Sequence, residues 1–185
     1  EHVRGAPVHA PQGNASQTIS SELSGRLNGD IITGCYLEIQ FPALKVNSDL
    51  PMYVWGVGYA AILTASISIG GSKIETLQGD YMEMASELHG PPGQHLQETC
   101  LKMDRVTIPE MSELSQKAFT CYVPIPFFFT RSAHCVLPCG RAFTRMIANP
   151  TVTVDIDLRK IQDLAISLPV DNANLTIDIP HASDG

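Results

Sequence analysis

The chain has 185 residues, and 12 Lys and Arg against 19 Asp and Glu give it a formal net charge of −7. With 44% hydrophobic and only 17% charged residues, it has enough apolar side chain to bury a core, which excludes a disordered chain. The basic residues are scattered singly, and this argues against binding to nucleic acid or to an anionic membrane surface, because both need clustered positive charge. The 14 Gly and 13 Pro favour a fold with many turns.

The first predicted strands lie near the N-terminus. Residues 16–27 form a weak candidate strand, and Asn28-Gly29 follows as the pair that best supplies two positive φ angles in a tight hairpin. In residues 31–41 apolar and polar side chains alternate until Pro42, as expected of a half-buried strand.

Residues 50–72 contain no charged side chain, which raises the question of a membrane span. From Ile62 onward, however, polar and apolar residues alternate with the period of a strand, and a membrane helix here would place hydroxyl groups in lipid. We therefore expect a core strand and no direct membrane insertion. The strand runs into Gly70-Gly71, a second hairpin signal that lacks the spacing of a phosphate-binding loop.

One short helix is predicted over residues 81–88, because Asp80 can cap its first turn and Glu83 can return the hydrogen bond. Residues 89–116 contain Gly-Pro-Pro-Gly and lack sustained periodicity. They are expected to form a long loop between strands, and loops of this kind often carry contacts.

Two clear patterns follow the loop. In residues 121–129 two prolines alternate with apolar residues, which fits an edge strand whose missing donors face away from its neighbour. Residues 151–159 alternate strictly between apolar and polar side chains, and residues 175–179 are a candidate for one more short strand.

These elements predict an all-β fold, a jelly-roll β-sandwich of two packed antiparallel sheets with one short helix and a long loop. Periodicity alone leaves an immunoglobulin-like sandwich open, although the Cys-Trp-Cys spacing of that fold is missing. The domain layout that we expect is an N-terminal arm with the first weak strand at 1–27, the jelly roll at 28–168, and a linker or the start of a second jelly roll at 169–185.

The five cysteines, at 35, 100, 121, 135 and 139, match no small disulfide scaffold, so we expect reduced thiols. The pair Cys135 and Cys139 has no second pair to complete a zinc site, and no nucleophile elbow, metalloprotease motif or phosphate loop is visible. The sequence therefore predicts neither an enzyme nor a cofactor or metal. The glycosylation triplets at Asn14 and Asn174 are interpreted as chance, because no secretory signal accompanies them.

Several blocks add to this pattern in a fixed order. After the glycine pair come Gly79-Asp80-Tyr81, then a proline-alternating aromatic stretch, then Val136-Leu137-Pro138. Over residues 28–160 this order resembles the first jelly roll of the major capsid proteins of nucleocytoplasmic large DNA viruses, with a departure from the family pattern at 139–150. The residues that match the family motifs are Gly79, Asp80, Tyr81, Tyr122, Pro124, Pro126, Phe127, Phe129, Arg131 and Pro138.

The resemblance implies a structural role, in which three double-jelly-roll chains form a pseudo-hexagonal capsomer and capsomers tile an icosahedral shell. It implies copies of the chain itself and neighbouring capsomers as partners, with minor capsid proteins as further candidates, and a place in the virion after assembly in the host cytoplasm. Because 185 residues hold one jelly roll, it also implies a partial sequence. We expect contacts at residues 89–116 and at 127–131, with at least two of the three consecutive aromatics in the core.

A second hypothesis is a β-sandwich module that binds a ligand or a glycan. Such a module would use a loop carboxylate, an amide and an aromatic ring. Trp55 is the only tryptophan, and it lies in an apolar run where burial is more probable than sugar stacking.

Overall fold

The computed structural model describes residues 17–22, 31–45, 50–89, 108–132, 134–138 and 151–168. The chain divides into two compact units, which are treated separately below. The first comprises the described residues of Glu1–Tyr36, Ile62–Met82 and Pro124–Lys160, and the second those of Leu37–Ala61, Glu83–Val123 and Ile161–Gly185.

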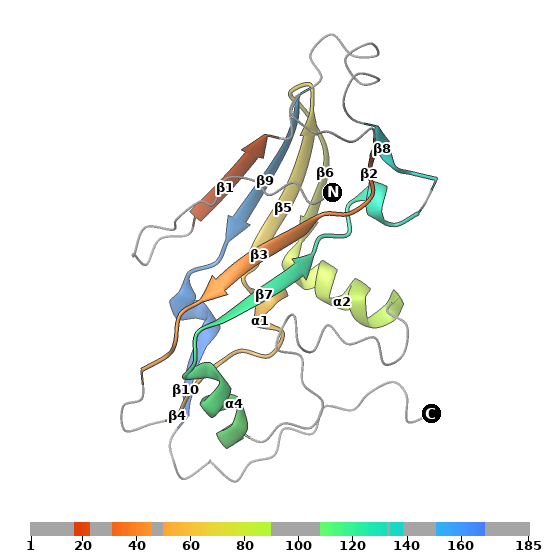
Figure 1. Cartoon of the computed structure of the whole chain (residues 1–185). Coiled ribbons are helices and arrows are strands. Elements are labelled where there is room, and N and C mark those ends of the chain that lie inside the picture. The colour runs from red at the N-terminus through yellow and green to blue at the C-terminus, as the bar shows by residue number, and fades with distance from the viewer. Residues whose placement is uncertain are drawn as a thin grey trace. The chain divides into compact units, whose positions relative to one another are not determined.

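A four-stranded antiparallel sheet dominates the first unit. Its strands are β1 (Gln17–Glu22), β9 (Val152–Leu158), β5 (Ile62–Ile69) and β6 (Ser72–Gln78), in that spatial order (Figure 1). The strand β9 therefore lies between β1 and β5, although it follows both in the sequence. The strands predicted from strict alternation at 62–69 and 151–159 are both confirmed.

The two faces of this sheet differ in chemistry. On one face β9 contributes Val152, Val154 and Ile156, and β5 contributes Ala65 and Ile67, all of which are buried. The other face carries polar side chains that are aligned in rows across the strands. One row comprises Thr18, Asp157, Thr64 and Gln78, and the next comprises Ser20, Asp155, Ser66 and Thr76. Alternation places each kind of side chain on one side of the pleat.

The strands β5 and β6 are joined by the two-residue turn Gly70-Gly71, with Ile69 opposite Ser72. Both glycines have positive φ, 58° and 82°, which is the conformation that a hairpin of this length requires. The Gly70 amide also donates a hydrogen bond to the Thr151 carbonyl at 2.8 Å, so the turn is anchored to the segment that enters β9.

Replacing Gly71 with valine is expected to lower the free energy of unfolding by about 1–3 kcal/mol, because a β-branched residue resists positive φ. An added Cβ at Gly71 would meet no atom within 4 Å, so the cost arises from the backbone and not from a clash. Urea titration measures the change, with Ser72→Val, at an exposed strand position beside the turn, as the matched control. Equal stability of the two variants would contradict the prediction.

The prediction of one continuous strand over 31–41 is wrong. The structure has β2 (Ile31–Ile32), an irregular stretch at 33–35, and β3 (Tyr36–Phe41). The reason is a change of partner, since β2 pairs with β8 (Leu137–Pro138) whereas β3 pairs with β7 (Phe119–Pro124). The end of β3 before Pro42 is confirmed.

The second unit contains the β3–β7 pair and a second antiparallel pair, β4 (Leu50–Tyr53) with β10 (Ala165–Leu168). The remaining elements are the helices α1 (Val57–Ala60) and α4 (Ile108–Ser115) and the 3₁₀ turn η2 (Ile161–Leu164). An aromatic cluster of Phe41, Tyr53 and Phe119 fills the core of this unit, with ring centroids 5.2 to 5.6 Å apart. The Tyr53 hydroxyl donates a hydrogen bond to the Pro42 carbonyl at 2.6 Å.

The described part of the chain contains more helices than the single one predicted from the sequence. The predicted helix is confirmed as α2 (Gly79–His89), but α4 lies inside the segment that we expected to be a loop. The buried face of α4 includes two serines, whose side chains bond to the neighbouring strand: Ser112 Oγ donates to the Pro51 carbonyl at 2.9 Å, and Ser115 Oγ accepts from the Tyr53 amide at 3.1 Å. Polar residues on the buried face hide the apolar period of a helix. None of the helices in the described part of the chain is long and apolar enough to cross a membrane.

The prediction that an edge strand extends over 121–129 is wrong, because the strand is shorter. The strand β7 ends at Pro124, and the three aromatics lie in a turn that contains the 3₁₀ helix η1 (Phe128–Thr130). The predicted turn at Asn28-Gly29, the predicted strand at 175–179 and the middle of the predicted loop at 90–107 lie outside the described residues, as do Cys100 and Cys139.

Candidate functional site

The turn at 127–131, where contacts were expected, belongs to the first unit. Phe127 and Phe129 are buried, at 0% and 1% exposure, and their rings are stacked with centroids 5.9 Å apart. The ring of Phe128 is half-buried and meets Phe129 edge to face at 5.4 Å. Two of the three consecutive aromatics are therefore core residues, as the sequence predicted.

A carboxylate on the neighbouring hairpin holds this turn. Glu75 of β6 accepts a hydrogen bond from the Phe128 amide at 2.8 Å and forms an ion pair with Arg131. The Arg131 guanidinium also donates from Nε to the Pro126 carbonyl at 2.9 Å. One side chain of the sheet thus binds both ends of the aromatic turn.

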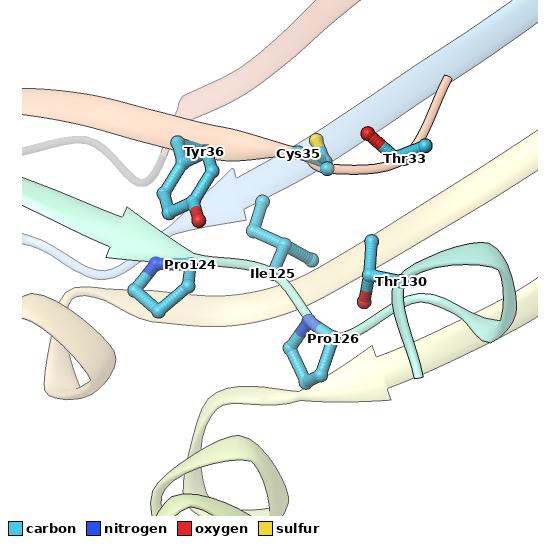
Figure 2. Close-up of a pocket in the computed structure, with 8 residues that line it drawn as sticks. Thr33, Cys35, Tyr36, Pro124, Ile125, Pro126 and Thr130 are labelled. Atoms are coloured by element: carbon cyan, nitrogen blue, oxygen red, sulfur yellow. The ribbon is translucent and has the colours of Figure 1, made fainter. Parts of the chain in front are cut away.

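Beside the turn lies a partly open cavity of about 220 Å³ (Figure 2). One wall comes from Thr33, Gly34, Cys35 and Tyr36, and the other from Pro124, Ile125, Pro126 and Thr130. The two walls are joined by a hydrogen bond from the Ile125 amide to the Cys35 carbonyl, at 2.9 Å. Among the residues that the structure describes, those that line the cavity carry no charged side chain.

Cys35 is one of the residues that line this cavity. Burial raises the pKa of the Cys35 thiol to about 11, so the thiol is neutral at pH 7. Within the described residues Cys35, Cys121 and Cys135 form no disulfide.

The motif residues Gly79, Asp80 and Tyr81 lie in the first turn of α2, which begins two residues earlier than predicted. Asp80 therefore lies within the helix, and its carboxylate accepts a hydrogen bond from Arg159 Nη2 at 2.9 Å. This ion pair joins the start of α2 to the end of β9. Tyr81 is 46% exposed.

The other motif residues are distributed over three places. Pro124 and Pro126 line the cavity. Pro138 is opposite Ile31 in the β2–β8 pair, and Tyr122 lies on β7 in the second unit with 46% of its surface exposed. The structure thus brings Pro124, Pro126, the motif phenylalanines and Arg131 together around one turn. Pro138 and Tyr122 belong to other strand pairs.

Asp157 is the best-satisfied carboxylate on the polar face of the sheet. It accepts hydrogen bonds from Thr18 Oγ1 at 2.5 Å and from Thr64 Oγ1 at 2.6 Å, and so connects three adjacent strands through side chains. These two bonds hold the pKa of Asp157 below its ordinary value of 3.8, with a smaller contribution from the positive charge of Lys73.

Replacing Asp157 with asparagine is expected to remove a pH-dependent part of the stability. Because the folded state favours the ionised carboxylate, this stabilisation is present above about pH 3.8 and is lost as the pH falls through the lowered pKa. We expect a loss below about 1 kcal/mol at neutral pH, because the side chain is only partly buried. Urea titrations at neutral and acidic pH measure it, with Asp155→Asn as control; a difference between wild type and D157N that does not shrink in acid would contradict the prediction.

Glu75 was missed as a functional residue, although the sequence contains a signal for it. In β6 it is opposite Ile67, and the next residue on that face, Leu77, is opposite Ala65. A charged residue that alternation places on the apolar face of a strand needs a hydrogen-bonding or oppositely charged partner. The partner, Arg131, follows 56 positions later, and no local pattern connects the two.

Comparison with known proteins gives consistent results. The family described as "Major capsid protein N-terminus" matches residues 9–181. Two capsid proteins of Acanthamoeba polyphaga mimivirus are similar in sequence: "Probable capsid protein 4" is 29% identical over 65% of this chain and 24% of its own length, and "Capsid protein 1" is 24% identical over 60% of this chain and 21% of its own. The chain thus spans about a quarter of the length of these relatives.

Among solved structures, the chain is similar to PBCV-1 VP54, whose crystal structure was fitted into a cryo-EM reconstruction of the virophage Sputnik. The TM-score is 0.51 at 16% identity, over 77% of this chain and 31% of the other. This likeness concerns the fold, and with the antiparallel strand pairs it confirms the predicted jelly-roll sandwich. Since the family match covers most of the sequence, the chain belongs to the major capsid proteins of nucleocytoplasmic large DNA viruses, and it is their N-terminal region that it matches.

Proposed function

We propose that this viral capsid protein assembles with copies of itself into trimeric, pseudo-hexagonal capsomers of an icosahedral shell. The observation that carries the proposal is the family match over residues 9–181. A structural role accounts for the chemistry described above, in which the cavity is lined by neutral groups and its cysteine is protonated.

The sheet of the first unit is suited to lateral contacts. In the described part of the chain, β1 and β6 each have a neighbouring strand on one side only. Exposed apolar side chains occur in the same unit at Ile31, Leu63 and Ile74. A cyclic trimer brings unlike surfaces of successive copies together in closed contacts, which can cover both strand edges and apolar side chains.

The proposed layout keeps the boundaries expected from the sequence: an arm at 1–27, the jelly roll at 28–168, and a linker or the start of a second jelly roll at 169–185. The partners proposed are other copies of the chain, neighbouring capsomers and minor capsid proteins. The location proposed is the virion, with assembly in the host cytoplasm.

Light scattering on the purified chain, together with negative-stain electron microscopy, tests this function. The expected result is a mass of three times the 20.1 kDa of one chain, or larger assemblies built from that unit. A monomeric mass at all concentrations, together with retention on a glycan array, would favour the ligand-binding alternative. Trp55, the ring that such a module would offer, is half-buried.

A further inference from the structure

The aromatic turn of the first unit is held by two sets of hydrogen bonds, one to Glu75 and one within the turn. Glu75 Oε2 accepts from the Phe128 amide at 2.8 Å, and Glu75 Oε1 accepts from Arg131. Within the turn, the Thr130 amide and hydroxyl both donate to the Phe127 carbonyl, at 2.8 and 3.0 Å. The turn is therefore internally bonded, and the carboxylate of Glu75 connects it to β6.

The position of this carboxylate has a physical reason. The first amides of a helix have no acceptor within the helix, and Phe128 is the first residue of η1. The preceding residues include Pro124 and Pro126, which have no amide hydrogen to donate. A negative charge that accepts both the free amide and a guanidinium forms charge-assisted bonds, which are roughly twice as strong as neutral ones.

Glu75, the anionic partner, is the more buried member of the ion pair. The side chain of Glu75 is 17% exposed and that of Arg131 is 44% exposed, so the ion pair is partly shielded from solvent. Phe127 and Phe129, which the turn holds in the core, are almost completely buried. If the carboxylate released the turn, both rings would lose the backbone constraint that keeps them inside.

We propose that Glu75 is the positioning residue of a latch, which holds the Phe127–Arg131 turn closed against the hairpin and lets this turn open as a unit while the four-stranded sheet stays folded. The latch also sets one wall of the cavity, since Pro124, Ile125, Pro126 and Thr130 belong to the latched segment or adjoin it. Opening would expose two phenylalanine rings and remove that wall together. This inference depends on the geometry of the turn and is independent of the assembly proposed above.

Amide hydrogen exchange on the full chain tests the latch, because it measures opening residue by residue. In Glu75→Ala the amides of Phe128 and Thr130 are expected to exchange at least about tenfold faster, while amides in β5 and β9 keep their rates. Glu75→Gln retains one acceptor without the charge and should give an intermediate rate. Glu22→Gln, which neutralises an exposed carboxylate on β1, is the matched control and should change none of these rates.

A second readout separates a latch from general stabilisation. High salt should speed exchange at Phe128 in the wild type but not in Glu75→Ala, because salt screens only an ion pair that is present. Faster exchange spread evenly over β5, β9 and the turn would overturn the proposal, because Glu75 would then stabilise the whole unit. Unchanged exchange at Phe128 in both Glu75 variants would overturn it as well. If the alanine variant fails to fold, the glutamine variant and the salt series still decide between these results.

Discussion

Replacing Phe127 with alanine is expected to lower the free energy of unfolding by about 3–5 kcal/mol. The ring is 0% exposed and stacks on Phe129, so its removal leaves a cavity as well as a loss of buried apolar surface. Phe129 cannot easily fill the space, because it lies in the middle of the same turn and is itself buried. Equilibrium denaturation in urea, followed by circular dichroism, measures the change.

The adjacent ring provides the control for this prediction. Phe128→Ala removes a side chain of the same size from the same turn, but from a half-buried position. Its cost should be clearly smaller, because less apolar surface returns to water. Equal losses of stability in the two variants would mean that the assignment of Phe127 to a buried position and of Phe128 to a half-buried one is incorrect.

Replacing Tyr53 with alanine is expected to cost a similar amount, about 3–5 kcal/mol, in the second unit. Tyr53 is completely buried, and its ring contacts both Phe41 and Phe119 edge to face. The alanine variant loses both ring contacts and leaves the Pro42 carbonyl without the tyrosine hydroxyl. Thermal and chemical denaturation measure the loss.

Tyr53→Phe divides this effect into its parts. The phenylalanine variant keeps the ring but loses the hydrogen bond of 2.6 Å to the Pro42 carbonyl, which should cost about 1 kcal/mol. If the phenylalanine and alanine variants were equally unstable, the hydroxyl and not the ring would be the main contribution. That result would contradict the aromatic cluster as the core of the second unit.

The strands that could be predicted from sequence are those with one buried and one solvated face. In β9, Val152, Val154 and Ile156 are buried while Asp155 and Asp157 lie in the polar rows, so the physical cause of alternation is visible in the sequence. The turn at Gly70-Gly71 is equally local, because a two-residue hairpin needs positive φ at both positions.

The elements that could not be predicted depend on partners distant in sequence. The helix α4 carries Ser112 and Ser115 on its buried face because Pro51 and Tyr53 offer them hydrogen bonds, and no periodicity of α4 itself reveals this. The break between β2 and β3 is similar, since each of the two strands pairs with a strand that is distant in sequence, β8 for β2 and β7 for β3. The same applies to the pairing of Glu75 with Arg131.

The spatial order of the four-stranded sheet also determines when it can form during synthesis. Thr18 and Asp157, which bond across β1 and β9, are 139 positions apart. The hairpin of β5 and β6 can close early, because its strands are consecutive in the sequence. In contrast, β1 pairs only with β9 in the described sheet, so it cannot pair until β9 has been synthesised. Long-range pairing of this kind is slow and leaves apolar strands exposed meanwhile. The ribosome therefore synthesises most of this polypeptide before β1 has a partner, and the four-stranded sheet can be completed only after β9 has emerged.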